Sequence, residues 1–501
     1  MQEPQWIFVA EITMAVDSDG TLQKHYACTD VGFTTLPGDA PPHTAIPPTL
    51  TDPGTLRREM FGADRPFGGV KPALGVVVLD NTSKRYSGWG AHGFDGRPFV
   101  LRRGPLGGAF PADFPIVYAC NAETGWHEGN EFRLTLTDAT KLLDRSVMKD
   151  TFIGGSVAEG GDQLMGQAKV RYIGAPRWCG PAPTHLSDAW GKTIYHVSTG
   201  RDVVARAWDN GNELQQANVL GDFWSYATGP ASGTFWLHYE DGNLYLRVGS
   251  RVVGDLRLYL STCQTDGAPW SMQALLAETG FDGEIVGTPI PGINAVVADT
   301  GVTYSRLFDD AANNAGLWYG IDRLGRFVVK PFDVPSGPPV LQLHRGNCMA
   351  VKRAPVQGMA VPLFQLSVNS MQTWKSGYTA PYNYVRHMFE ADQWLARLNY
   401  SDNTVLKKHP GARRLNMDML IGPYTGHEWA DFCDRYLRLF GVQRASYTVS
   451  LMLTSELLAV DLGDVVRLSW NDFDLSAGRL FRIIGIRYEL KARRIDLVLW
   501  G

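Results

Sequence analysis

The sequence predicts a mainly β protein made of several small barrel or sandwich domains, with a minor α+β part. Its 501 residues are enough for three or four domains of ordinary size. Gly 54 and Pro 29 together make up about one residue in six, and this turn-rich composition favours many short strands. Short runs alternate between apolar and polar residues, whereas helical periodicity appears only after residue 270.

The first predicted domain, residues 1–165, consists of strands joined by turns. Residues 6–12 alternate as a strand, residues 17–20 read Asp-Ser-Asp-Gly and form a turn, and residues 22–28 return as the hairpin partner. Further strands are predicted at 74–81, 94–104 and 132–137, after a Pro-rich loop at 37–53. Strands at such short spacing are typical of a small barrel or sandwich.

A second, all-β domain is predicted over residues 166–265, after a polar, glycine-rich loop at 139–165. Its strands are expected at 194–198, 203–211 and 234–237. The Asp209-Asn210-Gly211 segment predicts a hairpin turn, because Asn-Gly readily adopts the positive φ values that such turns need.

A small α+β domain is predicted over residues 266–335. A short helix is expected at 271–280, with Ser271 as its N-cap and Gly280 at its end. A second helix is expected at 305–316, where Leu307, Ala311 and Ala315 lie on one stripe. A hairpin over 317–329, with its turn at 322–325, completes this domain.

The last predicted domain, residues 336–501, follows a Pro-Ser-Gly-Pro-Pro linker and forms a β-barrel with one helix. The helix is expected at 424–440, where apolar residues recur at helical spacing. Strands are predicted at 364–368, 465–470, 479–486 and 497–500. A chain that ends in a full strand is held in place at its terminus.

Charge and composition exclude several classes of protein. The net charge of -4 leaves no general basic surface for gripping nucleic acid. No run of eighteen apolar residues is present, so no membrane-spanning segment is expected. The first residues lack both a basic region and an apolar stretch, so no secretory signal is expected either. We therefore expect a protein that is made in the cytoplasm.

The six cysteines are scattered, and no two of them have CxxC spacing. They are Cys28, Cys120, Cys179, Cys263, Cys348 and Cys433. This spacing supports neither a zinc ribbon nor a redox motif. The cysteines are expected to be reduced and mostly buried.

Several groups of polar residues come close to known catalytic patterns. His427 and Glu428 begin a near match to the zinc motif HExxH, but Asp431 stands where the second His belongs. Acidic residues in the first turn of a helix are favoured by the helix dipole alone, and this is the preferred interpretation.

Three other groups of residues contain side chains that could form sites. Loop residues His127, Glu128 and Glu131 offer cation ligands, Asp222 with Glu240 and Asp241 offers a carboxylate pair for glycoside hydrolysis, and Ser156 follows two glycines. Solvated acids beside turns are far more common than such sites, and Gly-Gly-Ser is not the nucleophile elbow. No catalytic, cofactor-binding or metal-ligating residue is therefore predicted.

Three segments near the C-terminus follow a recognisable order. Residues 461–468 read DLGDVVRL, residues 475–486 read LSAGRLFRIIGI, and residues 497–501 read LVLWG. This order resembles the C-terminus of the tail hub proteins of tailed bacteriophages, which often combine LGD-V-L, AG, FR-IGI and LWG. The segment 317–329, LWYGIDRLGRFVV, is similar to a second pattern of that family.

Weaker matches extend the resemblance over most of the chain. Residues 69–103, which include Phe-Asp-Gly-Arg at 94–97, resemble a Gly-rich entry followed by a strand pair in the family. The segment 194–211 resembles another family stretch, whereas 169–180 departs from the family pattern in detail.

The resemblance implies a structural protein of the virion, at the tail tip or baseplate of a phage with a long, non-contractile tail. It implies a homotrimer whose barrel domains form a ring below the distal tail protein. The tape-measure protein end and the tail fibre or central tip proteins would be its other neighbours. Viral DNA would pass through the ring without specific binding during host entry. No enzyme activity and no cofactor are expected.

A second hypothesis stays open: a receptor- or glycan-binding tail protein, or a tail-associated cell-wall hydrolase. The 15 Trp and 19 Tyr residues suit sugar-binding platforms. Aromatic residues are equally common in barrel cores and subunit interfaces. An aromatic-walled cleft with two opposed carboxylates would favour this second hypothesis.

Overall fold

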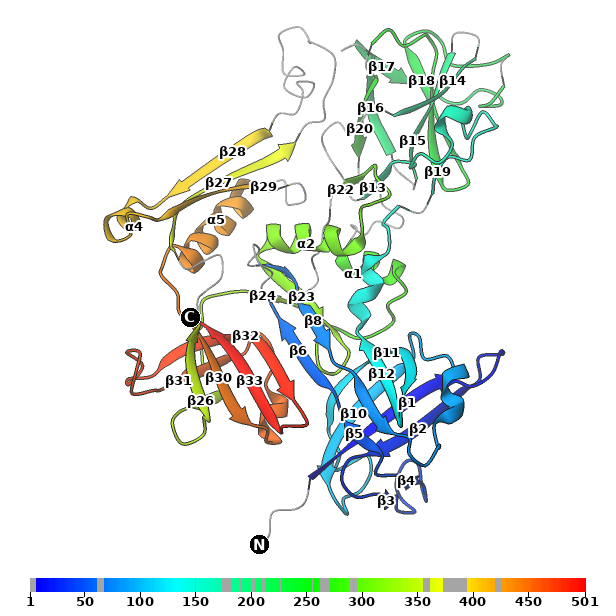
Figure 1. The fold of residues 1–501 in the computed structure, drawn as a ribbon. Helices are drawn as coiled ribbons and strands as arrows, with labels where there is room; N and C mark the ends of the chain where they lie inside the picture. Colours follow the sequence, from blue (N-terminus) through cyan, green and yellow to red (C-terminus); the bar gives the residue numbers. More distant parts are fainter. Residues whose placement is uncertain are drawn as a thin grey trace.

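The structure of the protein is a computed structural model of the whole chain. It describes residues 6–501 except 61–66, 149, 174–182, 190–191, 200–202, 210–211, 226, 255, 262–270, 289, 291–292, 294, 355–360, 373–393 and 420–425. The described part is mainly β, with curled sheets and a few helices (Figure 1). The fold class predicted from the sequence is therefore confirmed.

The N-terminal part is a seven-stranded antiparallel sheet. Its order is β2 (Leu22–Cys28), β1 (Trp6–Ala15), β10 (Pro98–Pro105), β11 (Ile116–Glu128), β12 (Glu131–Thr137), β9 (Val77–Asp80) and β5 (Leu50–Asp52). Strand β1 is buried on both faces, because a loop carrying the small ribbon β3 (Phe33–Thr34) and β4 (Ala45–Ile46) covers its outer side. The predicted hairpin over 6–28 is confirmed.

One predicted strand is wrong in its extent. The run at 74–81 is not a single strand but splits at Gly75 into β8 (Lys71–Leu74) and β9. The Gly75 amide donates to the Thr55 carbonyl at 2.7 Å, and a Cβ on Gly75 would lie 2.5 Å from the Thr55 hydroxyl oxygen. The chain therefore leaves one sheet and enters another at a point where only glycine fits.

Strands from the N-terminal segment complete sheets built by distant parts of the chain. Strand β6 (Thr55–Glu59) pairs with β32 (Arg479–Glu489) in the C-terminal sheet, and β8 pairs with β6. Strand β7 (Gly68–Gly69) lies parallel to β23 (Leu317–Ile321) in the central sheet. These pairings join the N-terminal segment, the central sheet and the C-terminal sheet through backbone hydrogen bonds.

The central α+β part contains the sheet β21-β24-β23-β7 and two helices. Its other elements are β21 (Ile285–Gly287), β24 (Phe327–Pro331), α1 (Met272–Glu278) and α2 (Tyr304–Ala315). The predicted caps of α1 are confirmed: Ser271 Oγ accepts from the Ala274 amide, and Gly280, with a φ of 85°, follows the last helical turn and the C-cap residue Thr279. Helix α2 ends in the same way at Gly316, which has a φ of 66°. The short pair β13 (Arg171–Ile173) and β22 (Ala295–Val297) lies beside this part.

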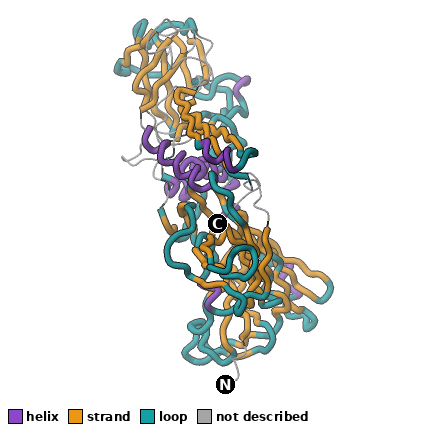
Figure 2. Tube along the Cα trace, turned by 90° about the vertical axis from the view of Figure 1, so that its left-hand side faces the viewer, coloured by secondary structure: helices purple, strands orange, loops and turns teal. Residues whose placement is uncertain are grey.

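A second seven-stranded sheet forms one end of the elongated molecule, and the N-terminal sheet forms the other (Figures 1 and 2). Its order is β14 (Thr184–Ala189), β15 (Lys192–Thr199), β19 (Asn243–Val248), β18 (Thr234–Glu240), β17 (Asn212–Gln216), β16 (Val203–Asp209) and β20 (Leu256–Ser261). Asp209 pairs with Asn212, as the predicted hairpin requires, although turn residues 210–211 lie outside the described residues. Figure 2 shows the helices between the two ends.

The C-terminal part is a curled sheet that approaches a barrel. Its order is β25 (Leu341–Leu343), β31 (Val465–Leu468), β32, β33 (Arg494–Trp500), β30 (Ser446–Met452) and β26 (Ala350–Ala354). The turn at 344–349 links β25 to β26, the two outer strands. The predicted strands at 465–470, 479–486 and 497–500 are confirmed as β31, β32 and β33.

A separate three-stranded sheet lies above this barrel and packs against helix α5 (Gly426–Phe440) (Figure 1). Its strands are β28 (Trp394–Ser401), β27 (Leu363–Gln372) and β29 (Arg413–Met419), and α4 (Asn403–Lys408) follows β28. The predicted helix at 424–440 is confirmed from Gly426 onward, and residues 424–425 lie outside the described residues.

One hydrophobic core joins the N-terminal sheet, α5, the C-terminal barrel and the face of the central sheet that carries Trp318 and Val328. A second core lies between the central sheet and its helices, and the remaining sheet has cores of its own. The domain boundaries after residues 165, 265 and 335 remain a proposal. Strands β6, β7 and β8 connect across them.

Candidate functional site

A site lined by charged side chains lies where the N-terminal segment, the central hairpin and the C-terminal barrel meet. Its floor is one face of the central sheet, where Trp318 lies opposite Lys330 in the β23–β24 register and Val286 lies beside Val328. The other face of this sheet, including Tyr319, packs in the core around the helices. The alternation of a strand thus directs Trp318 and Lys330 toward the barrel.

The roof of the site is the turn Asp461–Asp464, just before β31. The Asp461 amide donates to Asp464 Oδ2 at 2.8 Å, and the Leu462 amide donates to Asp461 Oδ1 at 2.6 Å. Gly463 has a φ of 86°, and a Cβ there would lie 3.0 Å from the Trp318 ring. Close approach of the turn to the indole therefore requires glycine.

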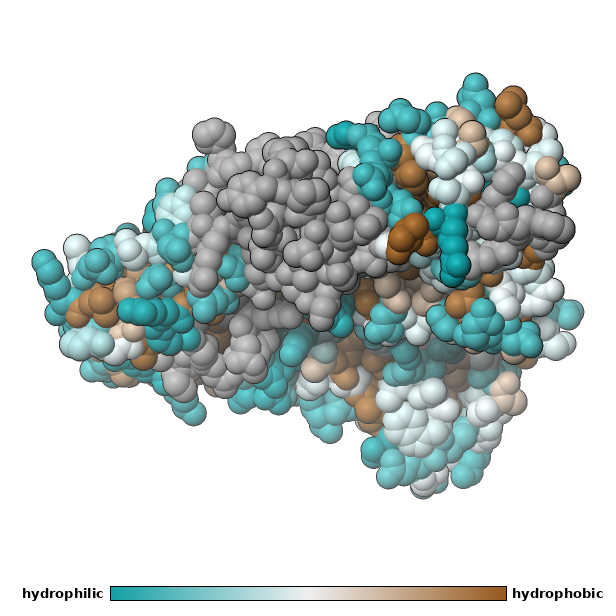
Figure 3. Space-filling model, turned by 90° about the horizontal axis from the view of Figure 1, so that it is seen from above, coloured by the Kyte–Doolittle hydropathy of each residue, from teal (hydrophilic) through white to brown (hydrophobic). Residues whose placement is uncertain are grey.

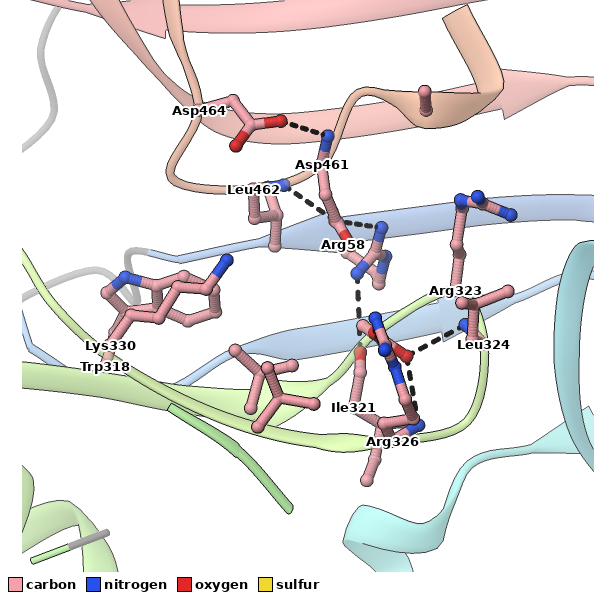
Figure 4. A pocket seen from close by; sticks show the side chains of 14 residues that line it. Arg58, Trp318, Ile321, Arg323, Leu324, Arg326, Lys330, Asp461, Leu462 and Asp464 are labelled. Carbon is pink, nitrogen blue, oxygen red and sulfur yellow. Dashed lines mark hydrogen bonds and ion pairs between the residues drawn. The ribbon is translucent and has the colours of Figure 1, made fainter. Parts of the chain in front are cut away.

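Arg58 lies on β6, the N-terminal strand that pairs with β32, and it connects the Asp461–Asp464 turn to the central sheet. Its guanidinium donates to Asp461 Oδ1 at 2.5 Å and to the Ile321 carbonyl at 3.4 Å (Figure 4). Arg58 is only 3% exposed. Burial acts to lower the pKa of Arg58, but the Asp461 carboxylate outweighs burial and raises that pKa, so the side chain stays charged.

The tip of the central hairpin is held by Asp322 and rests on the N-terminal sheet. Asp322 Oδ1 accepts from the Leu324 and Arg326 amides at 2.8 and 2.9 Å, and Oδ2 accepts from Arg326 Nε at 2.8 Å. The Arg323 carbonyl accepts from the Ala119 amide of β11 at 2.7 Å. The turn predicted at 322–325 is confirmed, and its side chains fix the hairpin between two sheets.

These elements enclose a cavity of about 210 Å³, which we call the junction cavity. It is lined by Arg58, Val286, Trp318, Ile321, Asp322, Arg323, Leu324, Arg326, Val328, Lys330, Ala459, Asp461, Leu462 and Asp464. Burial raises the pKa of Asp464 above its ordinary value. Four cationic and three acidic side chains thus meet around one small cavity, and they come from segments as much as 403 residues apart in the sequence.

The acids predicted near residue 127 are engaged in ion pairs. Glu128 and Glu131 lie at the β11–β12 turn, 3.0 and 2.9 Å from the Arg133 guanidinium. His127 packs edge-on against Phe132, with ring centroids 5.1 Å apart. Within the described residues, no group of three His, Cys, Asp or Glu is arranged to hold a metal ion.

The carboxylates considered for glycoside hydrolysis gather around one tryptophan. Glu240 accepts from Trp224 Nε1 at 2.8 Å, and Asp222 accepts from the Trp224 amide at 3.0 Å. Asp241 lies in the β18–β19 turn with a φ of 47°. Both engaged acids therefore position the indole, which packs against His238 and Tyr245.

The other candidates have local structural partners. Ser156 Oγ accepts from the Glu159 amide at 3.2 Å, and Glu159 pairs with the buried Lys169 at 2.6 Å. The side chains of His427 and Glu428 lie outside the described residues, while Asp431 is exposed on α5.

Four cysteines are described, and all four are free thiols. Burial raises the pKa of Cys28 and Cys433 to about 12 and that of Cys348 to about 11, and it raises the pKa of Cys120 as well. These thiols are therefore protonated at neutral pH, as expected for cysteines that serve as small apolar residues. Cys179 and Cys263 lie outside the described residues.

The described surface at one end of the molecule is mixed in polarity. Figure 3 looks onto the end that carries β27 and the β14–β20 sheet, and its visible described surface mixes small hydrophobic areas with hydrophilic ones. Exposed apolar residues of the described chain include Ile153, Leu220 and Val253. No described helix has the length and apolar character needed to cross a membrane.

Sequence comparison gives no family: no protein-family model and no curated protein matches the chain. Solved structures do match over most of its length. The tail protein from Neisseria meningitidis MC58 is 10% identical, with 99% of this chain and 96% of that chain covered and a TM-score of 0.44. The prophage MuSo2 43 kDa tail protein from Shewanella oneidensis is 10% identical, with 99% and 98% covered and a TM-score of 0.40.

A third structure, the prophage tail protein gp18 from Listeria monocytogenes EGD-e, is 11% identical. It covers 66% of this chain and 87% of its own, with a TM-score of 0.27. At these scores the likeness carries no argument about the function of this chain.

Proposed function

We propose that the protein is a structural subunit of a phage tail, and that a ring of its copies at the tail tip joins the tail tube to the tip. The sequence segments that resemble tail hub proteins support this proposal. They fold into β31, β32 and β33, the central strands of the C-terminal barrel, and into the hairpin that closes the junction cavity.

The observation that carries the proposal is the pairing of N-terminal strands with strands from distant parts of the same chain. Domains joined by linkers move relative to one another unless their interface is large and hydrophobic. Here β6 extends the C-terminal sheet, β7 extends the central sheet, and one core runs through all three parts. A subunit built in this way transmits force without hinging, as the wall of a tube must.

The proposed ring contains three copies, each contributing the N-terminal sheet and the C-terminal barrel. Six curled sheets would then face a sixfold tail tube and match it to a threefold tip. The distal tail protein, the tape-measure end and the tip fibres would be the neighbours. Viral DNA would pass through the ring during host entry.

Two measurements test the proposal. Light scattering after size exclusion should give about three times the 55.3 kDa chain mass. Immunogold labelling of tail particles with antibody against this chain should mark the tip alone. Label spread along the tube or on the capsid, or a stable monomer at all concentrations, would contradict the ring.

The second candidate is the glycan-binding or wall-degrading role, and the Trp224–Glu240 arrangement is its only structural support among the described residues. A cell-wall zymogram with the pure protein separates the two. Clearing that is lost in a Glu240→Gln variant, but kept in an Asp241→Asn variant of the adjacent turn, would favour the hydrolase.

A further inference from the structure

We propose that residues 150–169 form a strap over the β14–β20 sheet that opens in mild acid, with His196 beneath it as the trigger. The basis is a buried histidine of the sheet that packs against the strap beside a buried ion pair of the strap itself. This device does not depend on the role in a phage tail.

The strap is a loop whose two ends pair with each other and whose apolar side chains pack on the sheet. The Phe152 amide donates to the Gln167 carbonyl at 2.9 Å, and the Gly166 amide donates to the Phe152 carbonyl at 2.8 Å. Phe152 and Leu164 are buried in a small core with Tyr245 of β19. A loop held by one such layer of contacts can open locally while the rest of the protein stays folded.

His196, on β15, is completely buried where it meets the strap. Its ring packs edge-on against Phe152, with centroids 5.2 Å apart. His196 Nε2 donates to Asn243 Oδ1 at 3.1 Å, because an amide oxygen can only accept, whereas Nδ1 has no hydrogen-bond partner among the described residues. This environment suits a neutral imidazole, since a proton added at Nδ1 would place a charge in the interior without an acceptor.

The strap places a buried cation against the same phenylalanine. Lys169 Nζ lies 5.4 Å from the centre of the Phe152 ring and pairs with Glu159 Oε1 at 2.6 Å. The Glu159 carboxylate also accepts from the Ile153 amide at 3.0 Å, so the strap is folded around it. Protonation of His196 would therefore put a second cation beside Lys169, against a carboxylate that is already paired.

Charged and titratable groups surround His196 from several elements. They are Asp150, Glu159 and Lys169 on the strap, Tyr245 and Arg247 on the same face of β19, and His238 and Glu240 on the same face of β18. Burial, as the largest cause, lowers the pKa of His196 to about 4, and the Lys169 charge acts in the same direction. The hydrogen bond to Asn243 and the two strap carboxylates oppose this shift.

The groups next to His196 keep their charge between pH 7 and pH 5. Burial acts to raise the pKa of Glu159, but the Lys169 ammonium and the Ile153 amide outweigh it and lower that pKa, so Glu159 stays ionised. Burial raises the pKa of Tyr245 to about 12, so this phenol stays neutral. A loss of the strap in this pH range therefore reports on histidine.

The direction of the effect follows from the lowered pKa. Opening of the strap returns the imidazole to water, where its ordinary pKa is 6.5. A group whose pKa is lowered in the closed state stabilises that state above its open-state pKa, and this stability is lost as the pH falls toward the closed-state pKa. The equilibrium constant for opening should therefore rise about twentyfold from pH 7 to pH 5.

The test is hydrogen exchange of the full-length protein, read by mass spectrometry and corrected for the intrinsic effect of pH on exchange. Peptides from 150–169 should lose about twentyfold in protection between pH 7 and pH 5, and peptides from β33 should keep theirs. His196→Gln keeps a donor for Asn243 and removes the titrating ring, so its strap should hold nearly constant protection over this range.

The matched control is His238→Gln, which removes a half-buried histidine from the neighbouring strand β18, where it stacks on Phe223. It should respond to pH like the wild type. If His196→Gln does not fold, the wild type alone decides, because its loss of protection must begin near pH 6.5 and not near the ordinary pKa of a carboxyl group, about 4. An unprotected strap at pH 7, constant protection down to pH 5, equal loss in β33, or equal responses of the two variants would overturn the proposal.

Discussion

Among single residues, Arg58 makes the contacts that join the three parts of the molecule. Its neighbour on β6, Arg57, has its side chain 52% exposed and pairs with Glu59, whose side chain is 36% exposed. Arg58 is buried and pairs with Asp461, whose side chain is 25% exposed. Because strand side chains alternate between faces, two consecutive arginines occupy opposite environments.

This contrast gives the first prediction. Arg58→Met leaves the Asp461 carboxylate without its partner, and removing one member of a buried pair costs about 3–5 kcal/mol. Arg57→Met removes an exposed pair worth about 0–1 kcal/mol. Urea denaturation monitored by tryptophan fluorescence should therefore show a large loss of stability for the first variant and little for the second. Equal losses would show that Arg58 is not buried as described.

Asp464 gives a prediction about pH. Burial, as the largest cause, raises its pKa above the ordinary value of 3.8. A group whose pKa is raised by folding contributes stability below its unfolded pKa, and that contribution is lost as the pH rises through the folded pKa. Asp464→Asn keeps an oxygen for the Asp461 amide and removes the charge.

We therefore expect Asp464→Asn to raise the free energy of unfolding at pH 7 and to leave it nearly unchanged at about pH 3, where the wild-type carboxyl is neutral. Urea midpoints at both pH values measure this. Asp461→Asn is the comparison, and it should be destabilised at pH 7 because Arg58 loses its partner. A loss of stability for Asp464→Asn at pH 7 would mean that its attraction to Lys330 exceeds the cost of burial.

Among the elements, β33 is a strand whose core-facing residues are completely buried. It pairs with β30 on one side and β32 on the other, so it is an interior strand of the sheet. Ile495, Leu497, Leu499 and Trp500 are all fully buried. Phe332 and Phe440 pack against the Trp500 ring, with centroids 5.0 and 6.1 Å away.

Deleting residues 495–501 is therefore predicted to abolish folding of this part. The deletion leaves the inward-facing edges of β30 and β32 unpaired and removes apolar side chains that each contribute about 2–5 kcal/mol. Since domains are stable by only about 5–15 kcal/mol, the truncated chain should be insoluble and absent from particles. The soluble fraction after expression measures this.

Two point variants test whether the buried face of β33 is what matters, or whether any change near the C-terminus destabilises the protein. Leu497→Ala should lose about 2–5 kcal/mol. Val498→Thr, on the opposite and half-buried face of the same strand, should lose much less. Normal folding and assembly of the truncated chain would make the strand assignment and the proposal built on it untenable.

Helix caps, turns and single strands can be predicted from the sequence, because each depends on residues that are close together in the chain. Ser271, Gly316 and Asp322 each fix a cap or a turn through neighbours a few residues away, and all three act in the structure as their types suggest. The final strand could be predicted because the alternation of its residues marks it directly.

Pairing between distant strands could not be predicted in the same way. The alternation in 55–59 indicates a strand at most, and nothing local tells that Arg58 lies opposite Ile486. The junction cavity has the same origin, since Arg58, Lys330 and Asp464 are brought together only by that pairing. No motif spacing marks a site whose members are hundreds of residues apart.

At the scale of the whole molecule, the parts differ in how firmly they are joined. The N-terminal sheet, the central sheet and the C-terminal barrel share strands and a core, whereas the β14–β20 sheet has its own cores and stands at one end (Figure 1). We infer that the shared parts form the wall of the proposed ring and that the end sheet extends outward from it.

The last prediction concerns DNA. A wall that lets DNA pass must not hold its phosphates, and the net charge of -4 gives no general attraction to them. We expect fluorescence anisotropy with a labelled 30-base-pair duplex to give a Kd weaker than about 10⁻⁴ M at about 0.15 M salt, which is weaker than the range of about 10⁻⁴–10⁻⁶ M typical of non-specific DNA-binding proteins. Repeating the titration at lower salt should strengthen binding only slightly, because few phosphates are neutralised. Tight binding with a steep salt dependence would instead reveal a lysine- and arginine-lined channel and contradict a passive passage for DNA.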